Sequence, residues 1–408
     1  MAATAEMGEG ADDTPARRID PPDFLSRPAL AAILAALPGA RVVGGAVRDA
    51  LAGRAVADID VAVPEPPARV TERLQAAGVR VVPTGLAHGT VTAVTADGPV
   101  EITTLRRDEA TDGRHAVVAF TADWRADAAR RDFTINALSL RPDGAVFDYF
   151  GGLADLDAGR VRFVGDAAQR IAEDYLRILR YFRFQARYGR IPPEAATAAA
   201  LRAGVPGLAR LSAERVWSEL RRILVIPDPL AALRLMDALG VLAAVLPGAA
   251  VEALAPLVAA GAPPDPLLRL AALTAEDASA LGARLRLANH EQARLETIRG
   301  LPAPSPGDTD DALRRLLADI PADMAAQRAW LAQARRGGAG WDTLRARLAA
   351  MERPVFPLAG RDALALGAAP GPAIGAALAA VRDWWLAGGC RAGAAACREE
   401  LARRLRSC

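Results

Sequence analysis

The segment from Val42 to Asp49 reads VVGGAVRD, is followed by Asp58-Ile59-Asp60, and decides the fold of the N-terminal part of this chain. Apolar residues typical of a strand lead into a Gly-Gly turn and a short helix. A second strand with two carboxylates follows. Glycines let backbone N–H groups approach phosphate, a helix N-terminus favours anions, and paired aspartates bind divalent cations. This order predicts a binding seat for a nucleoside triphosphate and its metal.

Length and composition bound the classes of protein that remain possible. A chain of 408 residues is too long for one ordinary core, so we expect several domains. An apolar content of 52% with 24% charged residues indicates a folded, soluble protein. No apolar run is long enough to predict a membrane span, and the N-terminus lacks the apolar segment of a secretory signal. The three cysteines are confined to 390–408 without a CxxC pair, which favours a reducing, cytoplasmic location and argues against a disulfide framework or a zinc site.

The expected order of elements predicts an α+β protein. Residues 1–22 are expected to be a disordered leader. Residues 23–150 alternate helical and strand patterns around a small mixed sheet, whereas 106–126 are polar and predict a long loop. Strong helix formers broken by Pro and Gly predict a helical neck at 151–226 and a helical body and tail at 227–408. The expected strands of the first domain are 41–44, 58–63, 79–83, 89–96 and 100–105, and its expected helices are 28–37, 46–52 and 66–77.

The positive charge of the chain comes entirely from arginine and is unevenly distributed. Net charge is only +2, yet 177–222 contains ten arginines against three glutamates. Such a local excess is a candidate contact for the phosphate backbone of RNA. A solvated helical face is the alternative, which we favour for an Arg-rich helix taken alone. The candidates for RNA contact are Arg183, Arg187 and Arg190.

Two carboxylates share one face if 58–63 is a regular strand, because side chains alternate along a strand. Asp58 and Asp60 then repel each other unless a cation lies between them, and a divalent ion is the usual solution. An Asp-x-Asp pair alone is weak evidence for a metal site. The Gly-Gly turn and the helix that precede it strengthen the prediction.

These segments, GGAVRDALAGR and DIDVAV, resemble the signature of the polymerase-β-type nucleotidyltransferases, specifically the bacterial tRNA CCA-adding enzyme and poly(A) polymerase family. The resemblance continues in order from about residue 40 to 385. It implies an N-terminal nucleotidyltransferase palm followed by a helical neck, body and tail. The further matching segments are TGLAHGTVT at 84–92, EITTLR at 101–106, RRDFTINAL at 130–138, DYFGGLADLDAGR at 148–160, EDYLRILR at 173–180, ERVWSEL at 214–220 and GRDALALGAAPGPAIG at 360–375.

The resemblance implies template-independent addition of C, C and A to the 3′ end of tRNA, with CTP and ATP as substrates and the acceptor arm of tRNA as partner. Asp58 and Asp60 are expected to hold two Mg²⁺ ions that activate the tRNA 3′-hydroxyl and steady the leaving pyrophosphate. Glu101 is the expected third carboxylate, and an ordinary exposed strand glutamate is the alternative interpretation.

The same resemblance assigns residues to the triphosphate and the ribose. Arg131 and Asp132 are expected to recognise the ribose, because a carboxylate accepts a hydrogen bond from a 2′-hydroxyl. A structural ion pair is the competing interpretation. Asn136 is expected beside them, although it could only cap a turn. The expected triphosphate contacts are Gly44, Gly45, Arg48 as the cation and Asp49 as its orienter.

A continuous amphipathic helix is expected at 171–188. Asp174 and Arg177 lie one turn apart on its polar side, and Glu173 is placed to pair with Arg177. An acceptor beside donors is complementary to cytosine and adenine, which offer an amine next to an unprotonated ring nitrogen, and mismatches guanine and uracil. An exposed intrahelical ion pair is the alternative. The helix also supplies Arg180, and its expected core face is Tyr175, Leu179, Phe182 and Ala186.

Other segments narrow the family branch. Only three histidines occur, so no HD-type or HExxH centre is expected. The segment at 84–92 differs from the GRRFRLAHV type of poly(A) polymerases. The loop 112–115 is retained, whereas relatives that add only CC tend to lack it. Full CCA addition is therefore favoured over the alternatives, a poly(A) polymerase, an A-only-adding enzyme or a non-catalytic RNA-binding protein. The sequence does not predict an oligomeric state.

Overall fold

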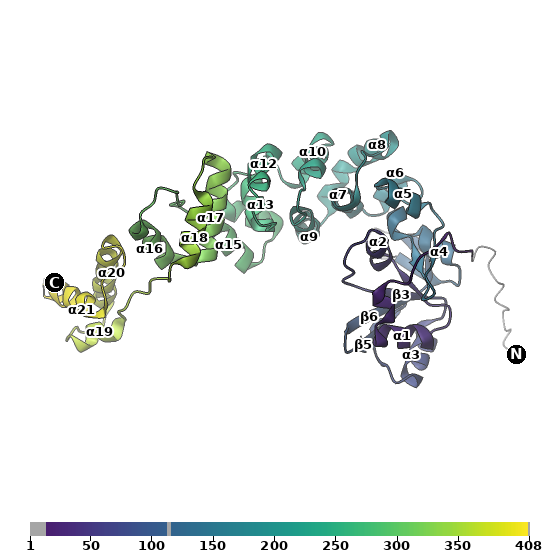
Figure 1. Ribbon diagram of the computed structural model, residues 1–408, viewed down its shortest axis with the longest axis horizontal. Helices are drawn as coiled ribbons and strands as arrows, with labels where there is room; N and C mark the ends of the chain where they lie inside the picture. Colours follow the sequence, from purple (N-terminus) through teal and green to yellow (C-terminus); the bar gives the residue numbers. More distant parts are fainter. Residues whose placement is uncertain (1–13, 112–115, 407–408) are drawn as a thin grey trace. The chain divides into compact units, whose positions relative to one another are not determined.

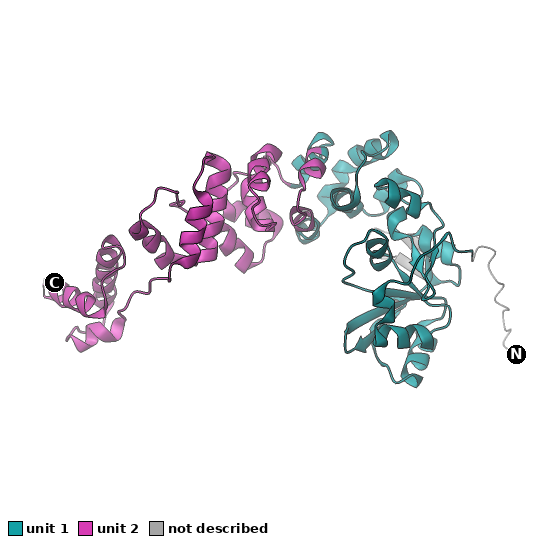
Figure 2. Cartoon of the chain, viewed as in Figure 1, with its two compact units in different colours: residues 1–219, 235–245 teal, residues 220–234, 246–408 magenta. Residues whose placement is uncertain are grey.

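The computed structural model describes residues 14–111 and 116–406. The chain divides into two compact units (Figures 1 and 2). Unit 1 comprises residues 1–219 and 235–245, and unit 2 comprises 220–234 and 246–408. Within the described residues, no helix combines the length and apolarity needed to cross a bilayer. The division near 219 lies close to the predicted end of the neck at 226, and the predicted boundary between palm and neck remains a prediction.

Unit 1 contains a mixed sheet in the order β1-β10-β9-β2-β3-β6-β5-β4. Among the described strands of this sheet, only β3 and β6 pair in parallel, and their register places Asp60 beside Glu101. Two carboxylates thus lie at neighbouring positions of adjacent strands. The strands are β1 Arg17–Arg18, β2 Arg41–Val43, β3 Asp60–Val63, β4 Arg80–Gly85, β5 Thr90–Thr95, β6 Gly98–Thr104, β9 Ser139–Leu140 and β10 Ala145–Phe147.

Helices α1 (Pro28–Ala36) and α3 (Pro67–Ala76) cover one side of this sheet (Figure 1). Ile33 of α1 and Leu74 of α3 are completely buried with Val61 of β3 in one core. Burial of these side chains removes apolar surface from water and fixes the register of β3. The start of β3 and the middle of β6, which bear Asp60 and Glu101, are therefore held by the core beneath them.

The predicted leader at 1–22 is too long. Arg17–Arg18 form β1, which pairs with β10, and Ala16 N donates to Val146 O at 2.8 Å. An edge strand is held by its backbone hydrogen bonds, so polar side chains gave no signal for it. Residues 1–13 lie outside the described part of the chain.

The predicted loop at 106–126 is also wrong. β7 (Arg106–Thr111) and β8 (Ala116–Phe120) form a separate antiparallel pair, and α4 (Trp124–Ala129) follows. Polar residues do not prevent strand pairing when the backbone groups hydrogen-bond to each other. Residues 112–115, on which the prediction of full CCA addition partly depends, lie outside the described residues.

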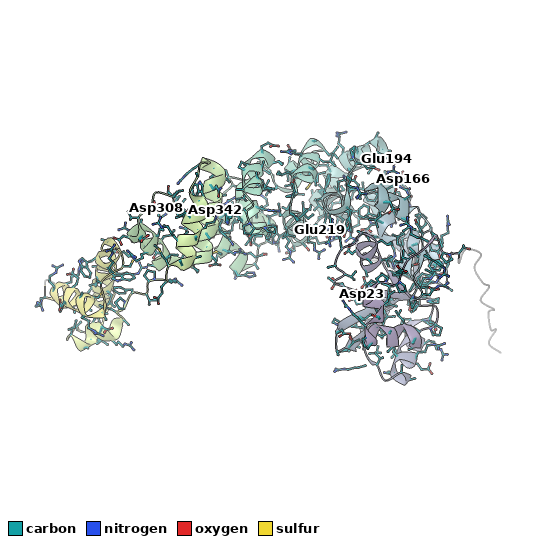
Figure 3. The ribbon with its side chains drawn as sticks, in the orientation of Figure 1. Asp23, Asp166, Glu194, Glu219, Asp308 and Asp342 are labelled. Atoms are coloured by element: carbon teal, nitrogen blue, oxygen red, sulfur yellow. The ribbon has the colours of Figure 1, made fainter. Side chains whose placement is uncertain are left out.

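The helix predicted at 171–188 is divided into α6 (Ala167–Glu173) and α7 (Leu176–Tyr188). Asp174 between them is extended, with φ −154° and ψ 108°, and its side chain accepts from Leu176 N at 3.0 Å. This local hydrogen bond starts α7 anew, because aspartate competes with the helical ladder for backbone N–H groups. Asp166, labelled in Figure 3, caps α6 by accepting from Gln169 N at 2.8 Å.

From α5 onward, all the described elements are helices, which confirms the predicted α+β fold with a helical remainder. In unit 2, α16 to α18 enclose one apolar core and α19 to α21 enclose another. The remaining helices are α2 Gly45–Leu51, α5 Gly152–Ala158, α8 Ala195–Gly204, α9 Ala213–Leu224, α10 Leu230–Ala238, α11 Val241–Val245, α12 Val251–Ala259, α13 Pro266–Leu273, α14 Ala278–Leu285, α15 Asn289–Arg299, α16 Asp310–Asp319, α17 Ala322–Arg336, α18 Trp341–Ala350, α19 Gly360–Ala365, α20 Pro372–Ala387 and α21 Ala394–Leu405. Short 3₁₀ turns occur at Asp23–Ser26, Leu86–His88, Thr134–Asn136 and Val205–Arg210.

Candidate functional site

Three carboxylates lie near the start of β3, where Glu101 in the middle of β6 is paired with Asp60. Asp60 is the first residue of β3 and pairs with Glu101 of β6. Asp58 lies two residues before β3, so the prediction that it belongs to the strand is wrong. The reason is the length of β2, which ends at Val43. Val43 lies opposite Asp60, so Asp58 lies beyond the end of β2 and has no residue there to pair with.

The negative charge of this cluster is only partly compensated. Burial raises the pKa of Asp60, the charges of Glu101 and Asp58 raise it further, and Arg131 opposes them without cancelling the shift. A bound cation relieves this repulsion, so the donor set suits a divalent metal. In the described parts of the chain, no three His, Cys, Asp or Glu side chains are already grouped to hold a metal ion. Mg²⁺ requires only one or two carboxylates, because water and substrate phosphate complete its coordination.

A pocket joins two of these carboxylates to cationic side chains. Asp60 and Glu101 line it together with Val43 at the end of β2. Opposite charges in one pocket suit a ligand that brings both a metal and phosphate groups. The cationic lining residues are Arg106, Arg130 and Arg131.

Asp127 of α4 holds two of the pocket arginines. This residue is 3% exposed, and its carboxylate accepts from Nε of Arg130 at 2.8 Å and Nη2 of Arg131 at 3.2 Å. Burial raises the pKa of Asp127, but the attraction of Arg130 and Arg131 outweighs burial, so the pKa lies below its ordinary value. Sequence reasoning missed Asp127, although its i,i+3 and i,i+4 spacing to two arginines is a usable signal.

The Gly-Gly turn between β2 and α2 adjoins the same arginine. Gly44 has φ 68° and ψ −123°, a backbone conformation that residues other than glycine rarely adopt. A Cβ atom at Gly44 would lie 3.1 Å from Nη1 of Arg131. Arg131 therefore lies between the turn and the carboxylates, a position that suits a phosphate contact as well as the predicted ribose contact.

Arg48 and Asp49 are buried behind this turn, at 7% and 8% exposure. Nε and Nη2 of Arg48 donate to Oδ1 of Asp49 at 3.1 and 3.0 Å, and Nη1 donates to Oδ1 of Asn136 at 2.5 Å. The pairing expected between Arg48 and Asp49 is present. Gly45 lies against this pair, since a Cβ there would lie 3.6 Å from Nη2 of Arg48. The predicted contact of Arg48 with a triphosphate remains a prediction.

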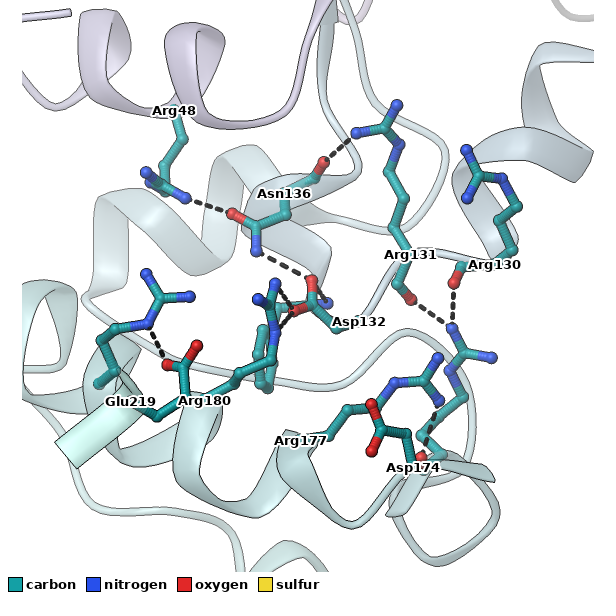
Figure 4. Close-up of polar contacts among 12 residues, drawn as sticks. Arg48, Arg130, Arg131, Asp132, Asn136, Asp174, Arg177, Arg180 and Glu219 are labelled. Carbon is teal, nitrogen blue, oxygen red and sulfur yellow. Dashed lines mark hydrogen bonds and ion pairs between the residues drawn. The ribbon is translucent and has the colours of Figure 1, made fainter. Parts of the chain in front are cut away.

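Asn136 connects Arg48 to Asp132 (Figure 4). Oδ1 of Asp132 accepts from Nδ2 of Asn136 and N of Phe133, both at 2.9 Å, and Oδ2 accepts from Nε and Nη2 of Arg180 at 2.7 and 2.5 Å. Burial raises the pKa of Asp132, but Arg180 and Asn136 outweigh it and the pKa is lowered. Four donors fill the acceptor sites of a carboxylate, so a ribose hydroxyl must displace one of them to bind Asp132.

Asp174 and Arg177 do not pair with each other. Arg177 donates through Nη1 to Glu173, as expected, and to O of Arg170 at 2.7 Å. Asp174 instead accepts from Nη2 of Arg215 in α9 at 2.8 Å. Arg215 was missed by sequence reasoning, although it lies in the recognised segment ERVWSEL.

The three arginines predicted to contact RNA all make intramolecular contacts. Nε of Arg183 donates to Glu219 at 2.6 Å, and Nη2 of Arg187 lies 3.5 Å from Oδ2 of Asp49. Arg190 donates to the backbone carbonyl of Asp157 in the last turn of α5. Their contact with RNA remains a prediction.

Two family models match this chain. Residues 40–162 match the poly A polymerase head domain, and residues 192–252 match the probable RNA and SrmB-binding site of polymerase A. The described pocket and the ring of contacts around Asp132 lie largely within the first match. The first match thus includes the carboxylates and the arginines that line the same pocket.

Curated relatives match over slightly less than half of the chain. The human mitochondrial CCA tRNA nucleotidyltransferase 1 is 53% identical over 193 residues, which cover 45% of this chain and 43% of that protein. The CCA-adding enzyme of Streptococcus pyogenes serotype M2 is 42% identical over 187 residues, 45% of either chain. The matched part therefore spans less than half the length of these relatives.

Solved structures match over nearly the whole chain. The Bacillus stearothermophilus CCA-adding enzyme in complex with CTP has a TM-score of 0.74 at 26% identity and covers 94% of this chain and 100% of its own. An apo form of a CCA-adding enzyme, at 22% identity and a TM-score of 0.66, shares the fold over 96% of each chain. The comparisons confirm the predicted resemblance to CCA-adding enzymes.

Proposed function

We propose that this chain, which bears the poly A polymerase head domain, adds C, C and A to the 3′ end of tRNA without a template, using CTP and ATP and releasing pyrophosphate. One observation carries the proposal. Asp60, the first residue of β3, lies beside Glu101 in the middle of the parallel strand β6, and both line a single pocket with Arg130 and Arg131. The names of the relatives support the same activity.

The metal requirement follows from the carboxylate cluster. We propose that Asp58 and Asp60, with Glu101 beside them, hold two Mg²⁺ ions. When bound, such ions supply positive charge that makes the tRNA 3′-hydroxyl more acidic and offsets charge on the leaving pyrophosphate. The raised pKa of Asp60 is the property expected of carboxylates that lack sufficient positive partners in the protein itself.

The arginines of the pocket are proposed to bind the triphosphate. Asp127 holds Arg130 and Arg131 in place, so little side-chain entropy is lost when phosphate binds. Gly44 leaves room for Arg131 beside the turn. This arrangement orients the α-phosphate toward Asp60 and Glu101, where the 3′-hydroxyl attacks.

Base selection is proposed to depend on Asp174 and Arg177. Each is held by another partner, Arg215 and Glu173 respectively, so that their remaining acceptor and donor groups have fixed directions. A carboxylate acceptor and guanidinium donors match the amine and ring nitrogen of cytosine and adenine. A protein side chain thereby replaces the template.

A poly(A) polymerase or an A-only-adding enzyme is the alternative, and the names of the relatives do not favour it. We also propose a cytoplasmic location and the acceptor arm of tRNA as the RNA partner. The arginine-rich segment that includes Arg202, Arg210 and Arg222 overlaps the match to an RNA-binding region.

The test uses purified protein, Mg²⁺ and a tRNA transcript that ends at the discriminator base, with each nucleotide supplied singly and together and the products sequenced. We expect CTP alone to add two residues and CTP with ATP to complete CCA. Asp58→Ala is the matched inactive control. Elongation of unrelated RNA with ATP alone would instead identify a poly(A) polymerase, and addition of A only to tRNA that already ends in CC would identify an A-adding enzyme.

A further inference from the structure

Helix α7 is joined to α2 by a chain of hydrogen bonds that begins and ends on α7, so that the helix itself closes a ring, here called the α7 ring. Two of its members, Arg180 and Tyr188, belong to α7 itself, eight residues apart. The others come from α2 and from the segment 132–136. The α7 ring consists of Tyr188, Asp49, Arg48, Asn136, Asp132 and Arg180.

Tyr188 closes this ring at the C-terminal end of α7. Its hydroxyl donates to Oδ1 of Asp49, the same oxygen that accepts from Arg48. Its ring centroid lies 4.6 Å from the Arg48 guanidinium, within cation–π range. Tyr188 is 8% exposed, and burial raises the pKa of its hydroxyl, which keeps the donor proton in place at neutral pH.

The other half of the ring returns to α7 near its beginning. Arg48 donates to Asn136, Asn136 donates to Asp132 at 2.9 Å, and Arg180 donates to Asp132 at 2.7 Å (Figure 4). Arg180 follows Arg177 by three residues, so this anchor lies one turn from the proposed base-reading arginine.

Two anchors on one helix restrict it more than one anchor does. Arg180 and Tyr188 are separated by about 12 Å along the axis, at 1.5 Å per residue. The buried side chains of Leu179 and Phe182 already hold α7 in the core, and Arg180 fixes its polar side close to Arg177. A second anchor at Tyr188, which reaches Asp49 as Arg187 does, limits the small rotation and tilt that core packing leaves to the helix and so sets the direction in which its first turn presents Arg177.

We propose that Tyr188 is a positioning residue for nucleotide selection, which acts through Asp49 and the α7 ring on the orientation of Arg177. This role rests on the proposed function, because it requires that α7 reads the incoming base. Tyr188 does not touch the nucleotide in this proposal.

The test replaces Tyr188 with phenylalanine and measures discrimination between bases. Tyr188→Phe keeps the ring over Arg48 and removes only the hydroxyl that reaches Asp49. The readout is the ratio of kcat/KM for CTP to kcat/KM for UTP on tRNA that lacks CCA. We expect this ratio to fall about threefold to tenfold. One hydrogen bond to a charged group is lost, and only part of its energy affects the orientation of Arg177. The ratio does not depend on the fraction of folded enzyme.

Tyr181→Phe is the matched control. Tyr181 lies on the same helix, is completely buried, and its hydroxyl donates to Oε1 of Gln185 at 3.3 Å rather than to a member of the α7 ring. The variant makes the same chemical change at a site without the ring contact. We expect its CTP/UTP ratio to match that of the wild-type protein.

Each outcome decides the proposal. A ratio in Tyr188→Phe equal to that of wild type and Tyr181→Phe, with or without a lower Tm, would overturn the positioning role and leave Tyr188 structural. An equal fall in both variants would overturn it as well. If the wild-type protein transfers no CTP to tRNA, the proposed function itself fails, and the role of Tyr188 fails with it.

Discussion

Asp60 and Asp132 are two carboxylates of the same unit with opposite electrostatic situations. Burial and the neighbouring Glu101 and Asp58 raise the pKa of Asp60. Asp132 is also buried, yet Arg180 and Asn136 lower its pKa. Burial disfavours the charged form of both side chains, so the opposite pKa shifts come from their neighbours, which are carboxylates at Asp60 and hydrogen-bond donors at Asp132.

Asp60 therefore has the electrostatics of a ligand-binding residue, whereas Asp132 has those of a residue that stabilises the fold. Asp132 has four donors and needs no further cation. Asp60 faces other carboxylates and gains from a bound cation. Both belong to sequence segments with family resemblance, so resemblance alone assigns both to the nucleotide site and does not distinguish them.

The largest expected effect comes from Asp60→Asn. Loss of this proposed metal ligand should lower the rate of CTP transfer about a thousandfold, the order of effect seen when an electrostatic group is removed from an active site. Ionised Asp60 destabilises the metal-free folded state at neutral pH, because its folded pKa is raised. The Tm of the metal-free variant should therefore rise.

Rates of single-turnover incorporation and thermal unfolding in EDTA measure the two effects of Asp60→Asn. A fall in activity together with a lower Tm would show that Asp60 is a structural carboxylate like Asp132. Retained activity would contradict the metal role directly.

Asp132→Asn should act mainly on stability. Removing one partner of a largely buried ion pair costs about 3 kcal/mol, since Arg180 is left without its counter-charge. The folded pKa of Asp132 is lowered, so its ionised form contributes stability at neutral pH that is lost as pH falls through that pKa. The variant should show a smaller loss of stability between neutral and acid pH than the wild-type protein.

Urea unfolding at several pH values measures this difference for Asp132→Asn. The exposed ion pair of Asp143 with Arg18 offers a control, because Asp143→Asn removes a solvent-exposed carboxylate of the same unit. Equal stability of the two variants would contradict the structural role assigned to Asp132.

Sequence reasoning predicted the fold correctly and singled out the carboxylates as candidates, because their signals are local. The Gly-Gly turn and the Asp-x-Asp pair have a fixed spacing, and the helical half has a clear period. It placed Asp58 inside β3 and joined α6 to α7, because the end of strand pairing and the hydrogen bond of Asp174 to Leu176 N depend on three-dimensional contacts. Arg215 and Tyr188 were missed because their partners lie far away in the sequence.

A moderate effect is expected for Arg177→Ala. This variant asks of an arginine what the first two ask of carboxylates, namely whether the side chain binds a ligand or stabilises the fold. Arg177 pairs with Glu173, but its side chain also belongs to the proposed base-reading pair. Loss of guanidinium donors to the base should reduce the preference for CTP over UTP about tenfold to a hundredfold. Competition between the two nucleotides on one tRNA measures the preference.

Arg202→Ala is the control for Arg177→Ala. Arg202 lies exposed on α8, and its replacement removes the same charge away from the pocket. An unchanged preference in Arg177→Ala, or an equal change in both variants, would remove the base-reading role and leave Arg177 with a structural role like that of Asp132.

The smallest expected effect is stabilisation by Mg²⁺, which we expect to depend on Asp60 and not on Asp132. An ion that binds only the folded state at ten times its Kd stabilises that state by about 1.4 kcal/mol. Thermal unfolding with Mg²⁺ and with EDTA should therefore show a higher Tm in Mg²⁺ for the wild-type protein. Asp132→Asn should retain this increase, because its carboxylate is already saturated, whereas Asp60→Asn should lose it. The same increase in all three proteins would place the ion elsewhere, and the raised pKa of Asp60 would then reflect repulsion that no metal relieves.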